Sequence, residues 1–366
     1  MAADTEKILV INPGSTSTKA ALFIGMAKHA EISVEHATAD VSAFEHLLDQ
    51  LFFREGVIRG FMRQNRWRET DLDAVVGRGG LLHPLEGGIY AVGPDMIADL
   101  RSGRYGEHAS NLGAPLAREI ADRADCPAYI VDPVVVDELD EVARLSGHPD
   151  LPRRSIFHAL NQRSVARLVA SRLGKAYEDC RFIVAHMGGG ITVGVHEGGR
   201  VVDVNNGLDG DGPFTPERSG SLPAGQMVSL CFHSGKTEKE IRRMIKGGGG
   251  VVAYCGTNDM KELADRAERG EPGIDGRPAP SVVLDAISRQ IAQAVCAHGA
   301  TLKGRVDAVI FTGGMARGPA LMERLRGMCE WMAPVEVVPG EREMEALAEG
   351  AVRALRGLEP VKEYVG

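Results

Sequence analysis

The chain contains two stretches of similar sequence that lie almost half a chain length apart. Residues 7–24 consist of an apolar run, a polar turn containing glycine and a second apolar run. Residues 181–196 repeat this order, with three glycines at 188–190 in the turn. The stretches align without gaps at an offset of 174 residues, and 73–80 likewise resembles 307–314. Because the offset is close to half of the 366 residues, it favours a duplicated domain over chance similarity of two hairpins.

Segments with helical periodicity lie between the strand-like runs. Apolar residues recur about every 3.6 positions in 281–303 and in 155–174, which predicts helices that turn one face to a core. The two stripes are Val283, Ile287, Ile291 and Val295, and Ile156, Leu160, Val165 and Leu168. Strands that alternate with helices predict an α/β architecture.

The expected domain boundary lies in a segment rich in turn formers, 146–152. We therefore predict a first domain of residues 1–152 and a second domain of residues 153–340. The final helical stretch, at about 341–366, is assigned to the first domain. Two domains also agree with the length, since domains usually contain about 100–200 residues.

Composition and charge exclude several classes of protein. With 42 Lys plus Arg against 50 Asp plus Glu, the net charge is −8, which argues against a nucleic-acid partner. No apolar run approaches the ~18–20 residues that a membrane helix needs. Residues 1–7 lack the apolar core of a secretory signal, and the six cysteines form no C-x-x-C pair. We therefore expect a cytoplasmic protein with reduced thiols and no membrane partner.

Three glycine-rich turns follow strand-like runs, at 14–18, 187–190 and 312–316. Such turns expose backbone N–H groups to phosphate oxygens. A single one is weak support, because many hairpins need glycine for conformational reasons, but three together favour a nucleotide site. Gly235-Lys236-Thr237 lacks the first glycine of a P-loop, and 247–250 lacks the context of a dinucleotide-binding motif.

Polar residues stand where predicted strands end, and ligands bind at the carboxyl ends of strands in open α/β sheets. Arg78 and Asp132 follow apolar runs, and Arg218 lies in a proline-rich loop. Taken alone, each arginine is more often part of a surface ion pair. His108 and His158, taken alone, are more often structural histidines than catalytic ones.

Three motifs together resemble those of the acetokinase family. Residues 12–19 (Asn-Pro-Gly-Ser-Thr-Ser-Thr-Lys) resemble its phosphate loop, usually Asn-Ala-Gly-Ser-Ser-Ser-x-Lys. Residues 186–192 (His-Met-Gly-Gly-Gly-Ile-Thr) resemble its second loop, and 311–316 (Phe-Thr-Gly-Gly-Met-Ala) its adenosine loop. The version with Pro13, and the sequence of 108–114, are more similar to butyrate kinases than to acetate kinases.

The resemblance implies a fold and an activity. The fold is two duplicated domains of the actin and hexokinase type, with a nucleotide cleft between them. The activity is phosphorylation of a short-chain carboxylate by ATP, reversibly, with Mg²⁺, in a homodimer or higher homo-oligomer. Butanoate is the expected acid; acetate, propionate or a branched acid is the alternative. A nucleotide switch without an acid substrate is the alternative from another class.

The resemblance also implies roles for individual residues. It assigns catalysis to Arg78, His108, His158 and Arg218, and the organisation of Mg²⁺ through water to Asp132 and Glu349. It assigns nucleotide or phosphate binding to Asn12, Gly14, Ser15, Thr16, Ser17, Lys19, His186, Gly188, Gly189, Gly190, Gly313, Gly314 and Met315. The sequence departs from the family pattern at Gly77, where acetate kinases carry His, at Gly189, usually Asn, and at 159–161 (Ala-Leu-Asn), usually Gly-Thr-Ser.

Overall fold

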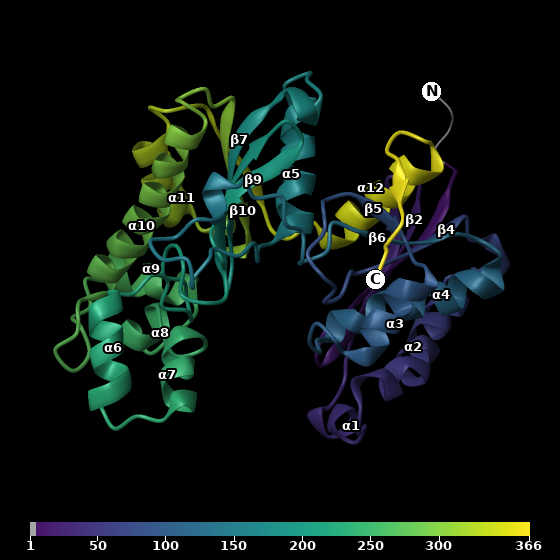
Figure 1. The fold of residues 1–366 in the computed structure, drawn as a ribbon, viewed down its shortest axis with the longest axis horizontal. Helices are drawn as coiled ribbons and strands as arrows, with labels where there is room; N and C mark the ends of the chain where they lie inside the picture. Colours follow the sequence, from purple (N-terminus) through teal and green to yellow (C-terminus); the bar gives the residue numbers. More distant parts are fainter. Residues whose placement is uncertain (1–4) are drawn as a thin grey trace. The chain divides into compact units, whose positions relative to one another are not determined.

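The computed structural model describes residues 5–366, which form two compact units (Figure 1). One unit contains the chain up to Val136 together with Arg342–Gly366, and the other is Asp137–Glu341. Both are mixed α/β units, as the sequence predicts. Residues 1–4, on which part of the expectation about a secretory signal rests, lie outside the described residues. Within 5–366, no helix is both long enough and apolar enough to cross a membrane.

Each unit is built on one sheet. The first sheet has the strand order β12-β5-β6-β4-β1-β2-β3 and the second β11-β10-β7-β8-β9. The strands of the first are β1 (Lys7–Pro13), β2 (Ser17–Ile24), β3 (Ala27–Glu35), β4 (Ala74–Gly77), β5 (Ile89–Ala91), β6 (Ala128–Val131) and β12 (Val361–Lys362). Those of the second are β7 (Arg181–Met187), β8 (Ile191–Glu197), β9 (Arg200–Val204), β10 (Ala308–Gly313) and β11 (Val335–Pro339).

The two sheets confirm the predicted duplication. The order β6-β4-β1-β2-β3 matches β11-β10-β7-β8-β9, and each pair of neighbours has the same direction, parallel or antiparallel, in both sheets. One side-chain contact is repeated as well. Asp73 Oδ2 accepts a hydrogen bond from the Lys7 amide at 2.7 Å, and Asp307 Oδ2 accepts one from the Arg181 amide at 2.7 Å.

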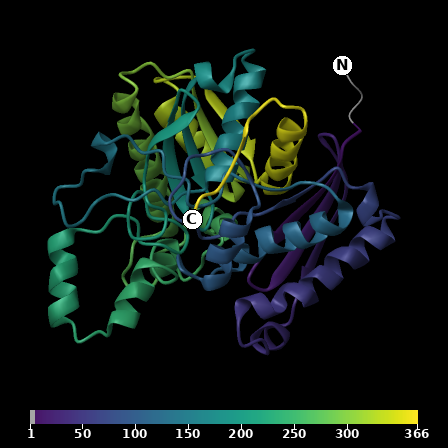
Figure 2. The same ribbon diagram turned by 45° about the vertical axis from the view of Figure 1, so that its right-hand side comes forward.

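Helices cover both faces of the first sheet. In this unit α12 packs on β1, β4 and β6, and α4 packs on β4 and β6 from the opposite face (Figures 1 and 2). The helices of this unit are α1 (Thr38–Ser42), α2 (Leu51–Gln64), α3 (Pro94–Ser102), α4 (Gly113–Ala124) and α12 (Glu343–Leu355). The C-terminal segment is therefore part of the first unit's core, as the sequence assignment expects.

The helices of the second unit are α5 (Ala159–Arg172), α6 (Ala224–His233), α7 (Glu238–Ile245), α8 (Val251–Cys255), α9 (Met260–Glu268), α10 (Pro280–Thr301) and α11 (Pro319–Cys329). Short 3-10 helices span Leu47–Gln50, Glu69–Asp71, Ala109–Leu112, Val142–Arg144, Tyr177–Asp179 and Gly314–Arg317 in the two units.

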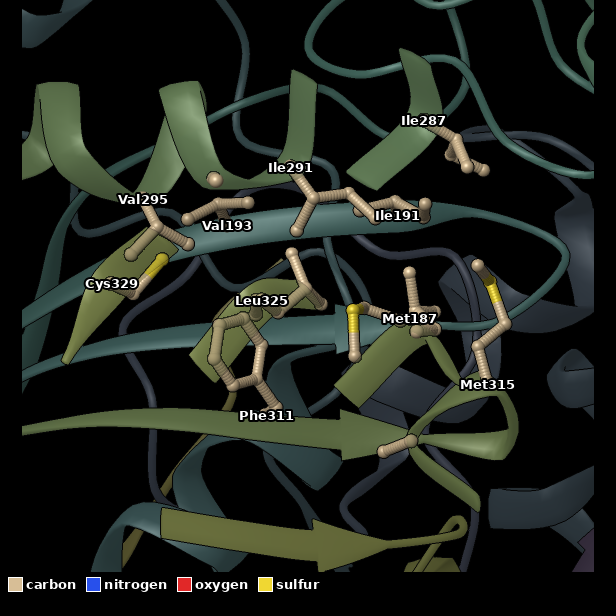
Figure 3. Packing of buried hydrophobic residues seen from close by; sticks show 14 of the residues in the cluster. Met187, Ile191, Val193, Ile287, Ile291, Val295, Phe311, Met315, Leu325 and Cys329 are labelled. Carbon is tan, nitrogen blue, oxygen red and sulfur yellow. The ribbon is translucent and has the colours of Figure 1, made fainter. Parts of the chain in front are cut away.

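The second sheet separates two hydrophobic clusters. Side chains alternate along a strand, so Ile183 of β7 faces one cluster and Phe182 and Val184 face the other. The larger cluster contains the predicted α10 stripe of Ile287, Ile291 and Val295, which is buried against β7 and β8 (Figure 3). The prediction of this helix and of its core face is confirmed.

The other predicted helix is shorter at its start. The stripe suggested 155–174, whereas α5 spans Ala159–Arg172. His158 has φ −84° and ψ 61°, a conformation outside the helical region, so the chain turns there before the helix begins. This turn places His158 at the N-terminus of α5, which matters for the site described below.

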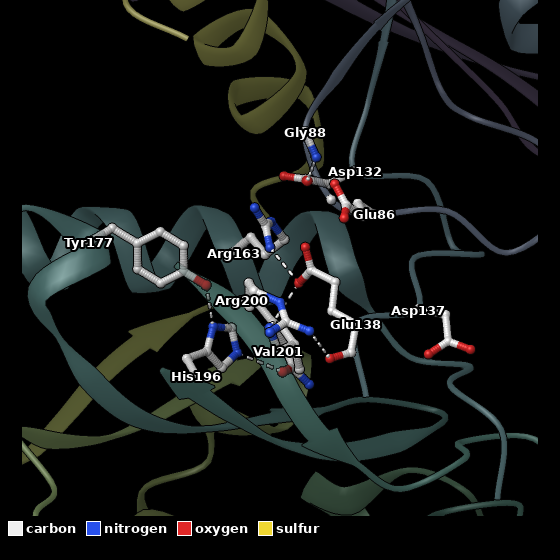
Figure 4. A network of polar contacts seen from close by, with 12 residues as sticks. Glu86, Gly88, Asp132, Asp137, Glu138, Arg163, Tyr177, His196, Arg200 and Val201 are labelled. Atoms are coloured by element: carbon white, nitrogen blue, oxygen red, sulfur yellow. Dashed lines mark hydrogen bonds and ion pairs between the residues drawn. The ribbon is translucent and has the colours of Figure 1, made fainter. Parts of the chain in front are cut away.

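The division between the units falls earlier than the crossover expected at 146–152. The segment after Val136 is tied to the second unit by Glu138, whose carboxylate accepts from Arg163 Nη1 at 2.9 Å and from the Val201 amide at 2.8 Å (Figure 4). The Asp140 amide also donates to the β9 backbone, at 2.9 Å. These long-range contacts, which sequence patterns do not show, move the boundary to Val136.

Candidate active site

The turn between β1 and β2 forms the first candidate phosphate loop. β1 ends at Pro13 and β2 begins at Ser17, and the register pairs Asn12 with Lys19 on the two adjacent strands. The Gly14 amide donates to the carbonyl oxygen of Ser17 at 2.9 Å. A Cβ at Gly14 would lie 2.6 Å from Ser17 Oγ, so a larger residue there would displace the Ser17 hydroxyl.

Arg78 is positioned by an unusually close contact between a helix and a strand. It follows β4 directly, and its amide donates to the Ile11 carbonyl at 2.8 Å. A Cβ on Gly77 would lie 2.2 Å from Gly113 O, and a Cβ on Gly113 would lie 2.2 Å from Arg78 O. Position 77 therefore has no room for the histidine that acetate kinases carry, because α4 occupies that space.

Glu343, at the start of α12, is a site residue that the sequence analysis misses. Its carboxylate accepts a hydrogen bond from Arg78 Nη1 and a second one, of 2.8 Å, from Asn12 Nδ2. The sequence feature that could have indicated Glu343 is the acidic segment 341–349. Within that segment, the resemblance assigns the organisation of Mg²⁺ to Glu349 and not to Glu343. Glu343 thus joins two residues that were predicted separately.

A cavity of about 280 Å³ brings these groups together in the first unit. Its walls are Asn12, Pro13, Gly14, Ser17, Lys19, Arg78, His108, Ser110, Val134 and Glu343. Three cationic or titratable donors therefore share a small cavity with a glycine and hydroxyl loop. Ser15 and Thr16, also predicted as phosphate ligands, are exposed in the turn and do not line it.

In the second unit, His158 and His186 stack on each other. Their ring centroids are 3.8 Å apart and the ring planes differ by 9°. His158 Nδ1 lies 2.9 Å from Thr192 Oγ1, and His186 Nδ1 lies 2.8 Å from Asn161 Oδ1. Asn161 belongs to the segment 159–161 that departs from the family pattern, and here it orients the ring of His186.

Arg218 lies against the glycine loop and beside this pair of histidines. A Cβ on Gly190 would be 2.3 Å from Arg218 Nη1 and 3.4 Å from His158 Cε1. Nη1 donates to the Gly207 carbonyl at 2.5 Å, while Nε is buried and has no hydrogen-bond partner within residues 5–366. Burial lowers the pKa of the Arg218 guanidinium, and the Glu217 carboxylate opposes that change. A buried guanidinium with an unused N–H is suited to binding an anion.

A larger cavity of about 1060 Å³ lies in the second unit. Four predicted nucleotide ligands, Gly188, Gly189, Gly314 and Met315, are among its walls. The start of α9 (258–261) and the segment 317–321 also line it, and the sequence analysis missed both. His186, Gly190 and Gly313 do not line it. At Gly313 a Cβ would lie 2.3 Å from the Met187 carbonyl, so this glycine allows β10 to end close to β7.

The two residues predicted to organise Mg²⁺ have other contacts. Asp132 is buried, and its Oδ1 accepts a hydrogen bond from the Gly88 amide at 2.7 Å (Figure 4). Glu349 forms a 2.6 Å ion pair with Arg342. No group of three or more His, Cys, Asp or Glu side chains in 5–366 is arranged to hold a metal. Among the residues that line the smaller cavity, Glu343 is the one that carries a carboxylate.

Comparison with known proteins identifies the family. A model of the Acetokinase family matches residues 149–329. A probable butyrate kinase from Clostridium botulinum (strain Alaska E43 / Type E3) is 47% identical over 358 residues, 98% of this chain and 99% of the relative. The chain belongs to the acetokinase family. Butyrate kinase 1 from Clostridium acetobutylicum shows the same identity over the same shares of the two chains.

Solved structures place this chain in the expected fold. An acetate kinase from Porphyromonas gingivalis has a TM-score of 0.75 at 19% identity and covers 95% of this chain and 99% of its own. A propionate kinase from Francisella tularensis has a TM-score of 0.70 at 17% identity, with 94% and 99% covered. The predicted fold class, two duplicated domains of the actin and hexokinase type, is confirmed.

Proposed function

We propose that this protein transfers a phosphoryl group between ATP and butanoate, forming butanoyl phosphate and ADP in a reversible reaction. The observation that carries the proposal is the cavity of about 280 Å³, which combines the β1–β2 loop with Arg78 and His108. The relatives that are 47% identical, which are named butyrate kinases, support butanoate as the acid. Pro13 and Val134 supply the cavity with apolar surface for an alkyl chain.

The chemistry needs no general base, because a carboxylate is already a charged nucleophile. A carboxylate oxygen forms a bond to the γ-phosphorus, the bond to the bridging oxygen breaks, and ADP leaves with that electron pair. The remaining difficulty is repulsion between anions. We assign its relief to Arg78 and Arg218, with hydrogen bonds from His108 and His158, so that catalysis is positioning plus charge stabilisation.

We assign the nucleotide to the larger cavity of the second unit. Its volume of about 1060 Å³ is sufficient for a nucleotide, and the glycines at 188–189 and 314 leave backbone amides accessible. Mg²⁺ would neutralise phosphate charge. Asp132 and Glu349 remain proposed ligands through water, and Glu343 is a third candidate because it lines the smaller cavity.

The first test of the function is formation of acyl phosphate, trapped with hydroxylamine, in reactions with ATP and Mg²⁺. We expect kcat/KM to be highest with butanoate among formate, acetate, propionate, butanoate, isobutanoate and valerate. Neighbouring acids should differ by about 10- to 200-fold at most, because an apolar pocket gains only ~1–3 kcal/mol per methylene. A maximum at acetate or propionate would change the preferred acid only. ATP binding without any acyl phosphate would instead support the nucleotide switch.

We further propose a homodimer that forms through α6. This helix buries none of its residues within the chain, although Val228 and Phe232 are apolar and 57% and 79% exposed. Val228 and Phe232 are four positions apart and therefore lie on one face of the helix, and we assign this face to the interface. All six cysteines are free, which supports the proposed cytoplasmic location.

Replacing Phe232 with aspartate is expected to convert a dimer into a monomer, because a charge would have to be buried in the interface. Light scattering coupled to size exclusion measures the mass of both proteins. Phe52→Asp is the matched control, since Phe52 is also exposed but lies on α2, and it should leave the dimer intact. A dimer that survives Phe232→Asp would place the interface elsewhere.

A further inference from the structure

A buried arginine lies behind the β1–β2 loop. Arg54 is in the first turns of α2, and its side chain is 0% exposed, which makes it the largest fully buried side chain in the described residues. Nothing in the sequence pattern draws attention to it, because it sits within an ordinary helical segment. Arginine is almost never fully buried unless it has a specific partner.

The partners of Arg54 are mainly groups of the loop itself. Nη1 donates to the Ser17 carbonyl at 2.5 Å and to Thr18 Oγ1 at 3.3 Å, and Nη2 donates to the Ser15 carbonyl at 3.2 Å. Gln50 Oε1 accepts from Nε at 3.0 Å and from Nη2 at 2.8 Å. The guanidinium therefore holds two carbonyls of one short turn at the same time.

The hydrogen bonds from Arg54 fix the orientation of the peptide groups in the loop. A trans peptide points its C=O and its N–H in opposite directions, and the described chain has no cis peptide bond. Because the Ser15 carbonyl points inward to Arg54, the amide of Thr16 points outward, where Ser15 and Thr16 are exposed. Thr16 is not itself among the walls of the smaller cavity, but Gly14 and Ser17 on either side of the turn are, so its amide lies at the edge of that cavity. An N–H in this place can bind a phosphoryl oxygen.

Arg54 also brings a positive charge that the described part of the chain does not neutralise. All of its hydrogen-bond acceptors are neutral: two carbonyls, one hydroxyl and one amide oxygen. The next carboxylate on the helix, Glu55, pairs with Arg123 at 2.5 Å instead. The buried Arg163 of the second unit differs, since its guanidinium contacts the Glu138 carboxylate at 2.9 Å.

The charge of Arg54 affects the pKa of its neighbour, His36. Burial and then the charge of Arg54 lower the pKa of His36, whose Nε2 lies 2.7 Å from Thr18 Oγ1, while Glu35 and Asp40 oppose that change. Burial also lowers the pKa of Arg54 itself, although a guanidinium remains protonated at neutral pH. A buried cation without a carboxylate partner is costly unless an anion completes the site.

We propose that Arg54 is a positioning residue for phosphoryl transfer: it holds the β1–β2 loop with the Thr16 amide outward and supplies the buried positive charge that the dianionic phosphoryl group neutralises. The inference rests on the proposed function for its reaction. The binding of a phosphate dianion by the loop is a separate claim that can be measured without turnover.

The test compares Arg54→Met, Arg54→Lys and the matched control Arg163→Met, which removes another buried arginine that contacts the Glu138 carboxylate and not the β1–β2 loop. We expect Arg54→Met to lower kcat with butanoyl phosphate and ADP about 10- to 100-fold, which is the loss expected when hydrogen bonds to a charged group are removed. In the forward reaction, the KM for butanoate should change less than about twofold. Arg54→Lys, which restores the charge but not both carbonyl contacts, should be intermediate. Arg163→Met should reduce thermal stability, because it removes the cationic partner of the buried Glu138 carboxylate. These kinetic constants should stay within about twofold, because Arg163 does not contact the β1–β2 loop.

The second readout is the affinity for inorganic phosphate, measured by calorimetry on each protein. Arg54→Met should weaken it about tenfold or more, and Arg163→Met should not. Wild-type kcat and wild-type phosphate affinity in Arg54→Met would overturn the proposal, as would equal losses in Arg163→Met. If Arg54→Met does not fold, Arg54→Lys decides by the same criteria. The wild-type protein could make no acyl phosphate while Arg54→Met still bound phosphate more weakly than wild type. The proposed function would then fail, and the role of Arg54 in binding phosphate would stand.

Discussion

Replacing Gly190 with alanine is expected to lower kcat about 100- to 1,000-fold while the protein remains folded. The added Cβ would lie 2.3 Å from Arg218 Nη1, which is the flexible end of a long side chain and can move. Gly190 does not have a positive φ, so alanine is tolerated by the backbone. The guanidinium would be displaced from the stacked histidines, and the charge that we assign to the transferring group would move away.

Gly189 provides the matched control in the same loop. A Cβ there would lie 3.5 Å from Glu217 Oε1, an ordinary contact, and Gly189 also does not have a positive φ. Gly189→Ala should therefore leave Arg218 in place and lower kcat far less than Gly190→Ala does. Because Gly189 lines the larger cavity, its effect should appear in the KM for ATP, and thermal unfolding should give similar midpoints for both variants. If Gly190→Ala kept full activity, or if the two variants lost activity equally, Arg218 would not depend on the space that Gly190 leaves.

Arg78→Ala is expected to lower kcat/KM about 100- to 1,000-fold in both directions of the reaction. The substitution removes the cationic side chain at the end of β4 and leaves Glu343 as an uncompensated carboxylate in the small cavity. Two negative groups, the acid and the phosphate, would then meet a third. Steady-state kinetics with butanoate and with butanoyl phosphate measures the loss.

Two further variants identify the source of that loss. Arg101→Ala removes an exposed arginine of the same unit that lies 3.8 Å from Glu119, and such surface pairs contribute little, so activity should be unchanged. Arg78→Ala combined with Glu343→Gln distinguishes the two roles of Glu343. Partial recovery of activity would mean that this carboxylate repels the anions once Arg78 is absent, and a further loss would mean that it serves Mg²⁺. Full activity in Arg78→Ala alone would remove Arg78 from the proposed mechanism.

The repeat and the loop motifs are predictable from sequence because their residues are neighbours in the chain. β1 and β2 are joined by a turn of three residues, so an apolar run, a glycine turn and another apolar run are enough to predict them. The same holds for β7, β8 and the α10 stripe. Duplication then extends this local information to the order of both sheets.

The residues that were missed depend on contacts between distant parts of the chain. Arg78 and Glu343 are 265 positions apart, and no local pattern relates them. Arg54 contacts Ser17 across 37 positions, through helix packing that sequence periodicity does not specify. The boundary at Val136 and the start of α5 at Ala159 depend in the same way on a buried carboxylate and on one non-helical residue.

The first unit is completed by the last 25 residues of the sequence, which gives the two units a definite order during synthesis. A ribosome finishes Asp137–Glu341 before it makes α12, and domains generally fold as units as they emerge. Translation proceeds at about 5–20 residues per second, so α12 is made roughly 10–40 seconds after the strands of the first unit. During that time the faces of β1, β4 and β6 that α12 covers in the folded protein remain uncovered. The first unit is therefore begun first and completed last. Its uncovered apolar sheet is the surface that a chaperone would contact on the nascent chain.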